Sequence, residues 1–330
     1  MYYKELKSPA LIKTGRDILK NIDWILKDAH FYYSDKVLLT QKILFDEYKD
    51  QLNLNVFSEI IFVQGGDASE AAELAGKING LDVILFGFGG GSVIDLVKYI
   101  GTKCDIPFVT MPTTLSNDSL CSTVARLMSG GKKRSYAVQP PLGILIDFGV
   151  VSRSPKNLTL AGVADVISNQ SAVKDWLLSN RNTGEPIDEL AMMLAKSAPT
   201  SLFKYNAEEV GSDEFLYDLA SGLILSGMSM MVTGSSRGAS GSEHLISHAI
   251  DEYFPDKSTI HGLQVGWAHL MVEKYCRKDM VEYARLSSFY ERIGLMATIR
   301  DCVPWKEEEF AGLIPYAKTI RKRYTIFDAL

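Results

Sequence analysis

The sequence predicts an α/β domain over residues 1–150, followed by an all-α domain over residues 151–330. Three observations favour this fold class. Short apolar runs alternate with helix-length segments as far as Asp147, which is typical of βαβ units and a largely parallel sheet. From Pro155 onward, the apolar spacing is almost wholly helical. The length of 330 residues allows two domains, each with its own core.

The strands of the first domain are expected where short apolar runs stand between helical patterns. These runs are Lys36–Thr40, Glu59–Val63, Asp82–Phe86, Pro107–Met111 and Gly143–Asp147. The spacing of Ser69–Ile78 predicts an amphipathic helix with Ser69 as its N-cap. A Gly-Gly pair at the centre of Ser122–Val138 predicts a β-hairpin.

The second domain is expected to consist of helices joined by polar turns. The predicted helices are Leu158–Ser179, Ile187–Asn206, Phe215–Thr233, Ser242–Tyr253, His261–Arg277, Met280–Ile293 and Lys306–Tyr324. The longest apolar stretch, Leu219–Val232, contains Ser and Gly and is too short to span a bilayer, so we expect no membrane insertion.

Composition narrows the function classes. A net charge of −5, from 35 basic and 40 acidic side chains, removes the argument for a nucleic-acid binder. The four cysteines are scattered, which disfavours a thiolate zinc site or a disulfide framework. Residues Met1–Lys20 carry charges throughout and have no apolar run typical of a signal peptide. We therefore expect a cytoplasmic protein.

A glycine turn follows the Asp82–Phe86 run, in the order Gly87-Phe-Gly-Gly-Gly-Ser-Val-Ile-Asp95. Glycines lack Cβ atoms, so a diphosphate can approach the backbone, and the next helix presents free N–H groups. Ser92 would cap this helix or donate to a phosphate. The spacing is not the usual Gly-x-Gly-x-x-Gly, so a merely tight turn is the alternative. This turn makes the first domain a candidate nucleotide-binding domain.

Polar residues follow the next predicted strand, in the segment Pro112-Thr-Thr-Leu-Ser-Asn-Asp118. Thr113 and Ser116 would lie at the carboxyl end of that strand, beside the glycine turn. Ligands gather at those ends in open α/β sheets. An equally simple interpretation is a polar turn without a ligand, in which Pro112 ends the strand.

An aspartate and a group of histidines mark the second domain as a candidate metal-binding domain. Asp165 lies on an otherwise apolar helix face, where a carboxylate is costly unless it is paired or bound to a cation. His244 and His248 are four residues apart on one helix, and His261 begins the next. One carboxylate and two imidazoles would leave an open position on a catalytic metal. The alternative is an ordinary polar helix face. His269 and His30 are interpreted as bystanders.

These residues resemble the glycerol-1-phosphate dehydrogenase family, in the superfamily of iron-type alcohol dehydrogenases, glycerol dehydrogenase and dehydroquinate synthase. The matching segments are Gly87–Asp95, Pro112–Asp118, Ala161–Asn169 with Ala172–Trp176, Ser235–His248, and His261–Gly266. Iron-type alcohol dehydrogenases usually carry a second metal histidine four residues after the aspartate. Asn169 at that position favours the glycerol-1-phosphate branch. The resemblance implies the dehydroquinate synthase-like fold, with an α/β cofactor domain and an all-α metal domain.

The resemblance also implies the site residues. Asp165, His244 and His261 would hold one divalent metal, usually zinc, with nickel or iron as alternatives. Asp118 and His248 would contact the substrate, with Asp165 as a further candidate for such a contact. The NAD or NADP site would be lined by Gly89, Gly90, Gly91, Ser92, Asp95, Thr113, Ser116 and Ser122.

The implied activity is the reversible NAD(P)H-dependent reduction of dihydroxyacetone phosphate to sn-glycerol 1-phosphate, a step of phospholipid metabolism. The metal would act as a Lewis acid at the C2 oxygen. His248 would bond a substrate hydroxyl or relay its proton. Lys174, Arg237 and the pair Ser235-Ser236 are positional candidates for the substrate phosphate. A small phosphorylated triose or polyol is the expected partner, and a homo-oligomer is left open.

Two departures from the family pattern bear on specificity. Asn117-Asp118-Ser119 stands where relatives usually have His-Asp-Gly. Thr40-Gln41-Lys42 stands where an acidic residue often bonds the adenosine ribose, which leaves both NAD and NADP open. The alternatives are a dehydrogenase of an unphosphorylated polyol such as glycerol, a dehydroquinate synthase-type enzyme, and a catalytically silent nucleotide-binding relative.

Overall fold

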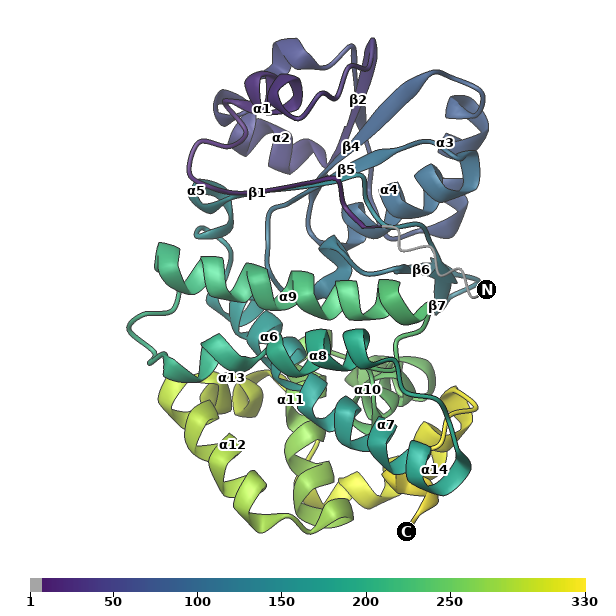
Figure 1. The fold of residues 1–330 in the computed structure, drawn as a ribbon, viewed down its shortest axis with the longest axis vertical. Coiled ribbons are helices and arrows are strands. Elements are labelled where there is room, and N and C mark those ends of the chain that lie inside the picture. The colour runs from purple at the N-terminus through teal and green to yellow at the C-terminus, as the bar shows by residue number, and fades with distance from the viewer. Residues whose placement is uncertain (1–7) are drawn as a thin grey trace. The chain divides into compact units, whose positions relative to one another are not determined.

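The computed structural model of the protein describes residues 8–330, in two compact units (Figure 1). Unit 1 comprises the described chain up to Leu115 together with Ser119–Ser154. Unit 2 comprises Ser116–Asp118 and Pro155–Leu330. The expectation of no signal peptide concerns Met1–Lys20. Residues 1–7 of that segment lie outside the described residues.

Unit 1 contains a six-stranded sheet in the order β1-β8-β5-β4-β2-β3, and every neighbouring pair is parallel. The strands are β1 (Leu11–Gly15), β2 (Asp35–Thr40), β3 (Glu59–Phe62), β4 (Val83–Gly89), β5 (Phe108–Pro112) and β8 (Gly143–Asp147). The parallel sheet confirms the predicted α/β class. β1 was not predicted; it is an edge strand none of whose residues is fully buried.

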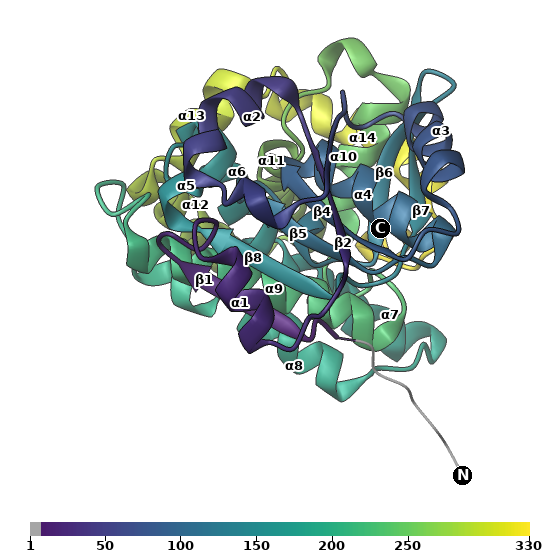
Figure 2. The same cartoon turned by 90° about the horizontal axis from the view of Figure 1, so that it is seen from above.

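Helices cover both faces of this sheet, which explains its continuous apolar runs. α3 (Ala68–Ile78) and α4 (Gly91–Cys104) lie on one face, and α1 (Ile22–Asp28) and α2 (Lys42–Tyr48) lie on the other (Figures 1 and 2). Alternate residues of β4 enter the two cores: Leu85 packs with the α3–α4 side, whereas Phe86 packs with the α1–α2 side. The short helix α5 (Phe148–Val151) follows β8.

Two local predictions in unit 1 have different outcomes. The hairpin is confirmed as β6 (Val124–Ser129) and β7 (Lys132–Ala137), with both turn glycines at positive φ. The cap of α3 was predicted wrongly, because Asp67 rather than Ser69 is the N-cap. The Asp67 carboxylate accepts hydrogen bonds from the N–H groups of Ser69 and Glu70, so the N-cap lies two residues before the predicted one.

Unit 2 is helical, as predicted. Its α-helices are α6 (Lys156–Ile167), α7 (Asn169–Thr183), α8 (Glu189–Ser197), α9 (Asp213–Thr233), α10 (Ser242–Tyr253), α11 (His261–Met271), α12 (Met280–Ile293), α13 (Leu295–Cys302) and α14 (Phe310–Ile320).

Several predicted helix boundaries in unit 2 differ from those found, and the main differences are these. The long helix expected from Leu158 breaks at Ser168, whose hydroxyl bonds to the Asp165 carbonyl. α8 ends before Pro199, and a 3-10 helix follows it at Thr200–Lys204. After α11, the chain continues as a π-helix at Val272–Arg277. The helix expected over Lys306–Tyr324 is shorter, and α13 was not predicted.

α9 is longer than the apolar stretch that the sequence analysis singled out. By length and composition alone, this 21-residue helix could cross a membrane. However, 67% of its most apolar window is buried inside the protein, as in the core helix of a soluble fold. Burial, rather than insufficient length, is therefore the argument against membrane insertion.

Candidate functional site

The three predicted metal ligands come together in unit 2. Asp165 lies near the end of α6, His244 in the first turn of α10, and His261 at the start of α11. One ligand atom from each lies within 4.8 Å of the others. The Nε2 atoms of His244 and His261 lie 3.5 Å and 4.0 Å from Oδ1 of Asp165. Three segments far apart in sequence thus present one carboxylate and two imidazoles to a common point.

Neighbouring side chains fix the orientation of both imidazoles. Nδ1 of His244 lies 2.9 Å from the carboxylate of Glu243, and Nδ1 of His261 lies 2.8 Å from the hydroxyl of Ser247. Gln264 in turn donates to that hydroxyl at 2.9 Å. Both rings therefore turn Nε2 toward Asp165, as metal-binding histidines do when a second partner holds Nδ1.

The electrostatics of the cluster favour a cation. Burial disfavours a protonated His244, but the carboxylates of Asp165 and Glu243 outweigh burial and raise its pKa to about 9. Burial would likewise raise the pKa of Glu243, yet hydrogen bonds from His244 and from the Gly241 N–H lower it to about 2. Two carboxylates around one imidazole thus leave excess negative charge at this point. One carboxylate oxygen and two imidazole nitrogens form a donor set that suits zinc, iron or nickel.

The predicted substrate-contact residues surround this cluster. The Asp118 N–H donates to Oδ2 of Asp165 at 3.1 Å, and the Ser226 hydroxyl donates to the Asp118 carboxylate at 3.1 Å. Ser226 also lies 3.3 Å from the Asn169 side-chain oxygen. His248 stacks on His261, with ring centroids 5.4 Å apart and planes 6° apart. Asp118 and His248 thus both lie beside the predicted metal ligands.

A second set of potential ligands shares one histidine with the first. His248, Asp251 and His261 also place ligand atoms within 4.8 Å of one another. The Asp251 carboxylate, however, already accepts hydrogen bonds from Ser258 and Gln264. Oδ1 of Asp165 instead lies within 4.0 Å of Nε2 of both His244 and His261, so the Asp165 set is the better ligand set.

Other predicted residues of unit 2 lie in different surroundings. Lys174 pairs with the buried carboxylate of Glu273 at 2.9 Å and with Asp279 at 3.4 Å. His269 is fully buried, 3.6 Å from Glu273, and lies outside both potential metal clusters. The guanidinium of Arg237 bonds to Glu185 in a separate pocket.

The glycine turn of unit 1 allows close packing of backbone against helix. β4 ends at Gly89, Gly90 is the N-cap of α4, and no described side chain caps that helix. Ser92 therefore lies inside the first turn and does not cap it. A Cβ at Gly89 would lie 2.6 Å from Val93, so only glycine fits there. The uncapped start of α4 offers an anion backbone N–H groups and the positive end of a helix dipole.

The sheet order places this turn where cofactors bind in open α/β sheets. β2 and β4 are neighbours, but the chain leaves β2 toward β3 and leaves β4 toward β5, on opposite sides. A crevice at the carboxyl ends of two such strands is the usual ligand position. Gln41 and Lys42 follow β2 there, and the N–H of buried Thr113 donates to the Gly89 carbonyl at 2.9 Å.

Two of the expected cofactor residues belong to a hydrogen-bond network around Lys98, which the sequence analysis missed. The buried Lys98 ammonium lies 3.0 Å from the Asp95 carboxylate and 3.3 Å from the Ser122 hydroxyl. The other Asp95 oxygen accepts the Arg126 N–H at 3.0 Å. The spacing of three residues between Asp95 and Lys98 on one helix could have indicated this ion pair from the sequence. In unit 1, this network joins α4 to the hairpin.

Comparisons with known proteins identify the family of the chain. Residues 15–155 match the model of the iron-containing alcohol dehydrogenase family. The chain is 32% identical to a glycerol-1-phosphate dehydrogenase (NAD(P)+) of Thermofilum pendens, over 82% of this chain and 78% of that one. It is 36% identical to the protein of the same name from Methanosphaerula palustris, over 76% and 68% of the two chains.

A solved structure shows the same fold. The crystal structure of a probable glycerol dehydrogenase from Sinorhizobium meliloti superimposes with a TM-score of 0.76, over 98% of this chain and 93% of that one, at 18% identity. This likeness concerns the fold alone, whereas the two sequence relatives define the branch. The chain therefore belongs to the glycerol-1-phosphate dehydrogenase family of the iron-containing alcohol dehydrogenases.

Proposed function

We propose that this protein is a metal-dependent oxidoreductase that reversibly reduces dihydroxyacetone phosphate to sn-glycerol 1-phosphate with NADH or NADPH. The observation that carries the proposal is the convergence of Asp165, His244 and His261 at one point, where the first two are buried and His261 is partly buried. The names of the sequence relatives support the substrate and the cofactor. An intact donor set argues against a catalytically silent relative.

Asp165, His244 and His261 would hold the metal, and Glu243 and Ser247 would keep the two rings in position. A bound divalent cation supplies Lewis-acid polarisation of the substrate carbonyl. We take zinc as the first candidate because imidazole and carboxylate ligands suit it, with iron and nickel to be tested beside it. Asn169 donates no bond through its side-chain nitrogen to a described residue, so this amide is a further candidate for a substrate contact.

His248 and Asp118 are proposed to act on the substrate. An imidazole titrates near neutral pH, so His248 suits the proton that the C2 oxygen gains on reduction and loses on oxidation. The Asp118 carboxylate, held by the Ser226 hydroxyl, would accept a hydrogen bond from a substrate hydroxyl. The two side chains would thereby orient a short polyol.

The cofactor is proposed to bind unit 1 at Gly89, Gly90, Gly91, Ser92 and Thr113. The uncapped start of α4 would receive the diphosphate. Asp95 and Ser122 would support this site through Lys98. Gln41 and Lys42 carry no negative charge that would repel a 2′-phosphate, so the proposal includes NADP as well as NAD.

The test is an assay of the purified protein with dihydroxyacetone phosphate and either NADH or NADPH, combined with metal analysis and chiral analysis of the product. We expect turnover, one metal per chain and sn-glycerol 1-phosphate. Turnover of glycerol but not of the phosphorylated substrate would indicate a polyol dehydrogenase instead. A metal-free protein without turnover on any polyol would rule out the proposal. We further propose a cytoplasmic location and leave self-association to a measurement of mass in solution.

A further inference from the structure

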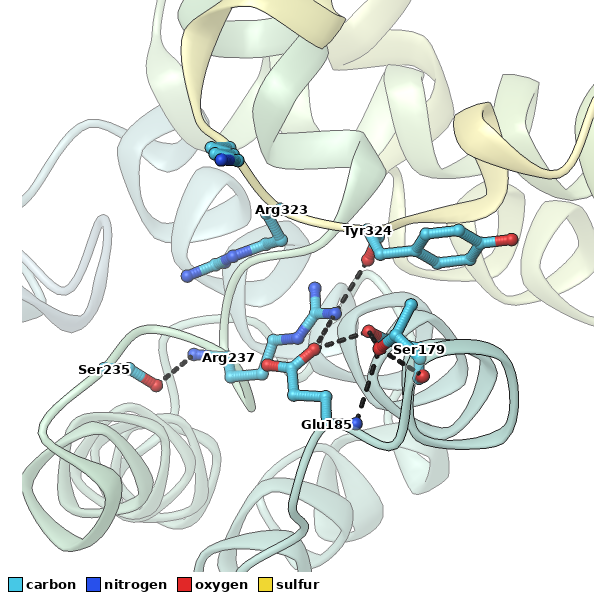
Figure 3. Close-up of a pocket in the computed structure, with 8 residues that line it drawn as sticks. Ser179, Glu185, Ser235, Arg237, Arg323 and Tyr324 are labelled. Carbon is cyan, nitrogen blue, oxygen red and sulfur yellow. Dashed lines mark hydrogen bonds and ion pairs between the residues drawn. The ribbon is translucent and has the colours of Figure 1, made fainter.

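A polar pocket of about 370 Å³ lies in unit 2 at the C-terminal end of α7 (Figure 3). Three segments of the chain meet there. They are the end of α7 with the loop after it, the loop between α9 and α10, and the chain after α14. The volume lies at the lower end of the roughly 300–1,000 Å³ typical of small-ligand sites.

Positive charge dominates this pocket. Arg237, Lys322 and Arg323 line it, and Glu185 is the acidic residue among its lining side chains. The negative end of the α7 dipole contributes only about half a charge against this excess. Three cations facing one carboxylate therefore leave the pocket short of negative charge.

Individual atoms of the Arg237 guanidinium also lack hydrogen-bond acceptors within the described part of the chain. This side chain is only 2% exposed, yet Nη2 alone has acceptors, namely Glu185 at 2.5 Å and the Tyr324 carbonyl at 2.7 Å. Its Nε and Nη1 are buried and have no hydrogen-bond partner among the described residues. Buried charged donors without acceptors are costly, so this geometry calls for an acceptor that the described chain does not supply.

Arg323 lines the same pocket and lies above Arg237 in the view of Figure 3. It donates to the Ser240 carbonyl at 2.5 Å and to the Ser236 hydroxyl at 3.1 Å, both neutral acceptors. Burial, reinforced by repulsion from Arg321 and Arg237, lowers the pKa of Arg323 to about 10. A bound anion would relieve that repulsion, and guanidinium groups match the geometry of phosphate oxygens.

The pocket is separate from the metal cluster of the same unit. Ser179, which lines the pocket, lies ten residues along α7 from Asn169, or about 15 Å at 1.5 Å per residue. Asn169 is the α7 residue beside the metal cluster. A three-carbon phosphate held by the metal ligands is too short to fill this pocket as well.

We propose that this pocket is a second ligand site, which binds a phosphate dianion, either inorganic phosphate or the phosphate of a small monoester. Arg237 and Arg323 hold the dianion, and Lys322 adds positive charge. Ser179 and Ser235 also line the pocket, and their hydroxyls can donate hydrogen bonds to the dianion. Glu185 occupies part of this site in the absence of the ligand and competes with it for Arg237. The site goes beyond the proposed function, because binding here needs neither cofactor nor turnover.

The test is calorimetric titration of the full-length protein with inorganic phosphate, without cofactor. We expect Arg323→Gln to weaken binding by on the order of tenfold to a hundredfold, because charge-assisted hydrogen bonds are lost. Glu185→Gln should instead tighten binding by about tenfold, because it removes the competing carboxylate. A gain in affinity is a result that general damage to the fold does not produce.

Arg181→Gln is the matched control, because Arg181 lies on the same helix but is exposed and does not line this pocket. Its phosphate affinity should equal that of the wild type. The absence of phosphate binding in the wild type, equal losses in the Arg323 and Arg181 variants, or an unchanged affinity in Glu185→Gln would overturn the proposal.

A second arm identifies the source of the phosphate group. Titration with sn-glycerol 1-phosphate is compared between the wild type and Arg323→Gln, so that binding at the metal cluster cancels. An Arg323-dependent affinity above that for inorganic phosphate assigns the site to a phosphomonoester, and an equal affinity assigns it to inorganic phosphate. Loss of turnover in any variant would bear on the proposed function and not on this site.

Discussion

The glycine turn of unit 1 would offer a ligand backbone groups, whereas the Asp165, His244 and His261 cluster of unit 2 would offer a metal side chains from three helices. The turn depends on the absence of side-chain atoms, since a Cβ at Gly89 would overlap Val93. The cluster depends on particular side-chain atoms and on the carboxylate and hydroxyl that orient them. Removing the charge of a side chain should therefore damage the metal cluster, and adding a side-chain carbon should damage the glycine turn.

The largest effect is expected from Asp165→Asn. It removes the anionic ligand of the cluster, so metal content should fall to background and turnover by at least about a thousandfold, or about 4 kcal/mol of transition-state stabilisation. Metal analysis, steady-state kinetics and NAD(P) titration check this, and cofactor affinity should hold. Asp301→Asn, at an exposed position, is the control. Full activity in Asp165→Asn would remove the metal assignment.

Glu243→Gln tests whether residues behind the ligands matter. We expect metal affinity to fall by roughly tenfold to a hundredfold, because the partner of His244 Nδ1 loses its charge. The pKa of His244 should fall with it, so the pH at which protons displace the metal should move down. Metal titrations at several pH values measure both effects. A loss of affinity without a shift along the pH axis would indicate a purely structural role for Glu243.

Gly89→Ala adds one carbon to the backbone-built site. Its Cβ would lie 2.6 Å from Val93, and overpacking of this kind costs about 1–3 kcal/mol. We expect NAD(P) affinity to fall by about tenfold while metal content stays unchanged. Gly76→Ala in α3 is the matched control, because its Cβ would meet no atom within 4 Å. Equal cofactor affinity in both variants would contradict the assignment of the turn.

The smallest effect concerns pH and the metal-free protein. The pKa of His244 is raised from 6.5 to about 9 in the folded state, so protonation of this ring stabilises the fold. That contribution is fully present below pH 6.5 and is lost as pH rises through about 9. Urea unfolding of the metal-free protein should therefore show falling stability over this interval. Bound metal should reverse the trend, because it requires the neutral ring.

The sequence predicted those elements whose signals are local. β8, α10 and α12 were predicted with the bounds found, because each has unbroken apolar spacing between turn residues. The break at Ser168 could not be predicted, because no Gly or Pro marks it and the hydroxyl bond that accompanies it depends on the fold. β1 has too few apolar residues for a strand signal, and its pairing with β8 comes from distant sequence.

The candidate site divides in the same way. Residue types and their spacing indicated Asp165 and the histidines between positions 244 and 261, because charged and metal-binding groups are conspicuous on apolar helices. The family resemblance selected His244 and His261 among those histidines. Glu243 was missed because adjacent residues on a helix point in different directions. The Glu243 side chain was therefore not expected to contact the ring of His244. Lys98 was missed because full burial of an ammonium is visible only in three dimensions.

The three-residue segment Ser116–Asp118 belongs to unit 2, although it lies in the N-terminal half of the chain. The main chain consequently passes from one unit to the other at three places, after Leu115, after Asp118 and after Ser154. A C-terminal fragment that begins at residue 151 would lack Asp118, whose N–H donates a hydrogen bond to Asp165. Exchange of the N-terminal half with a relative would therefore move Asp118, the proposed substrate contact, together with the proposed cofactor site, so the two proposed roles could not be exchanged independently.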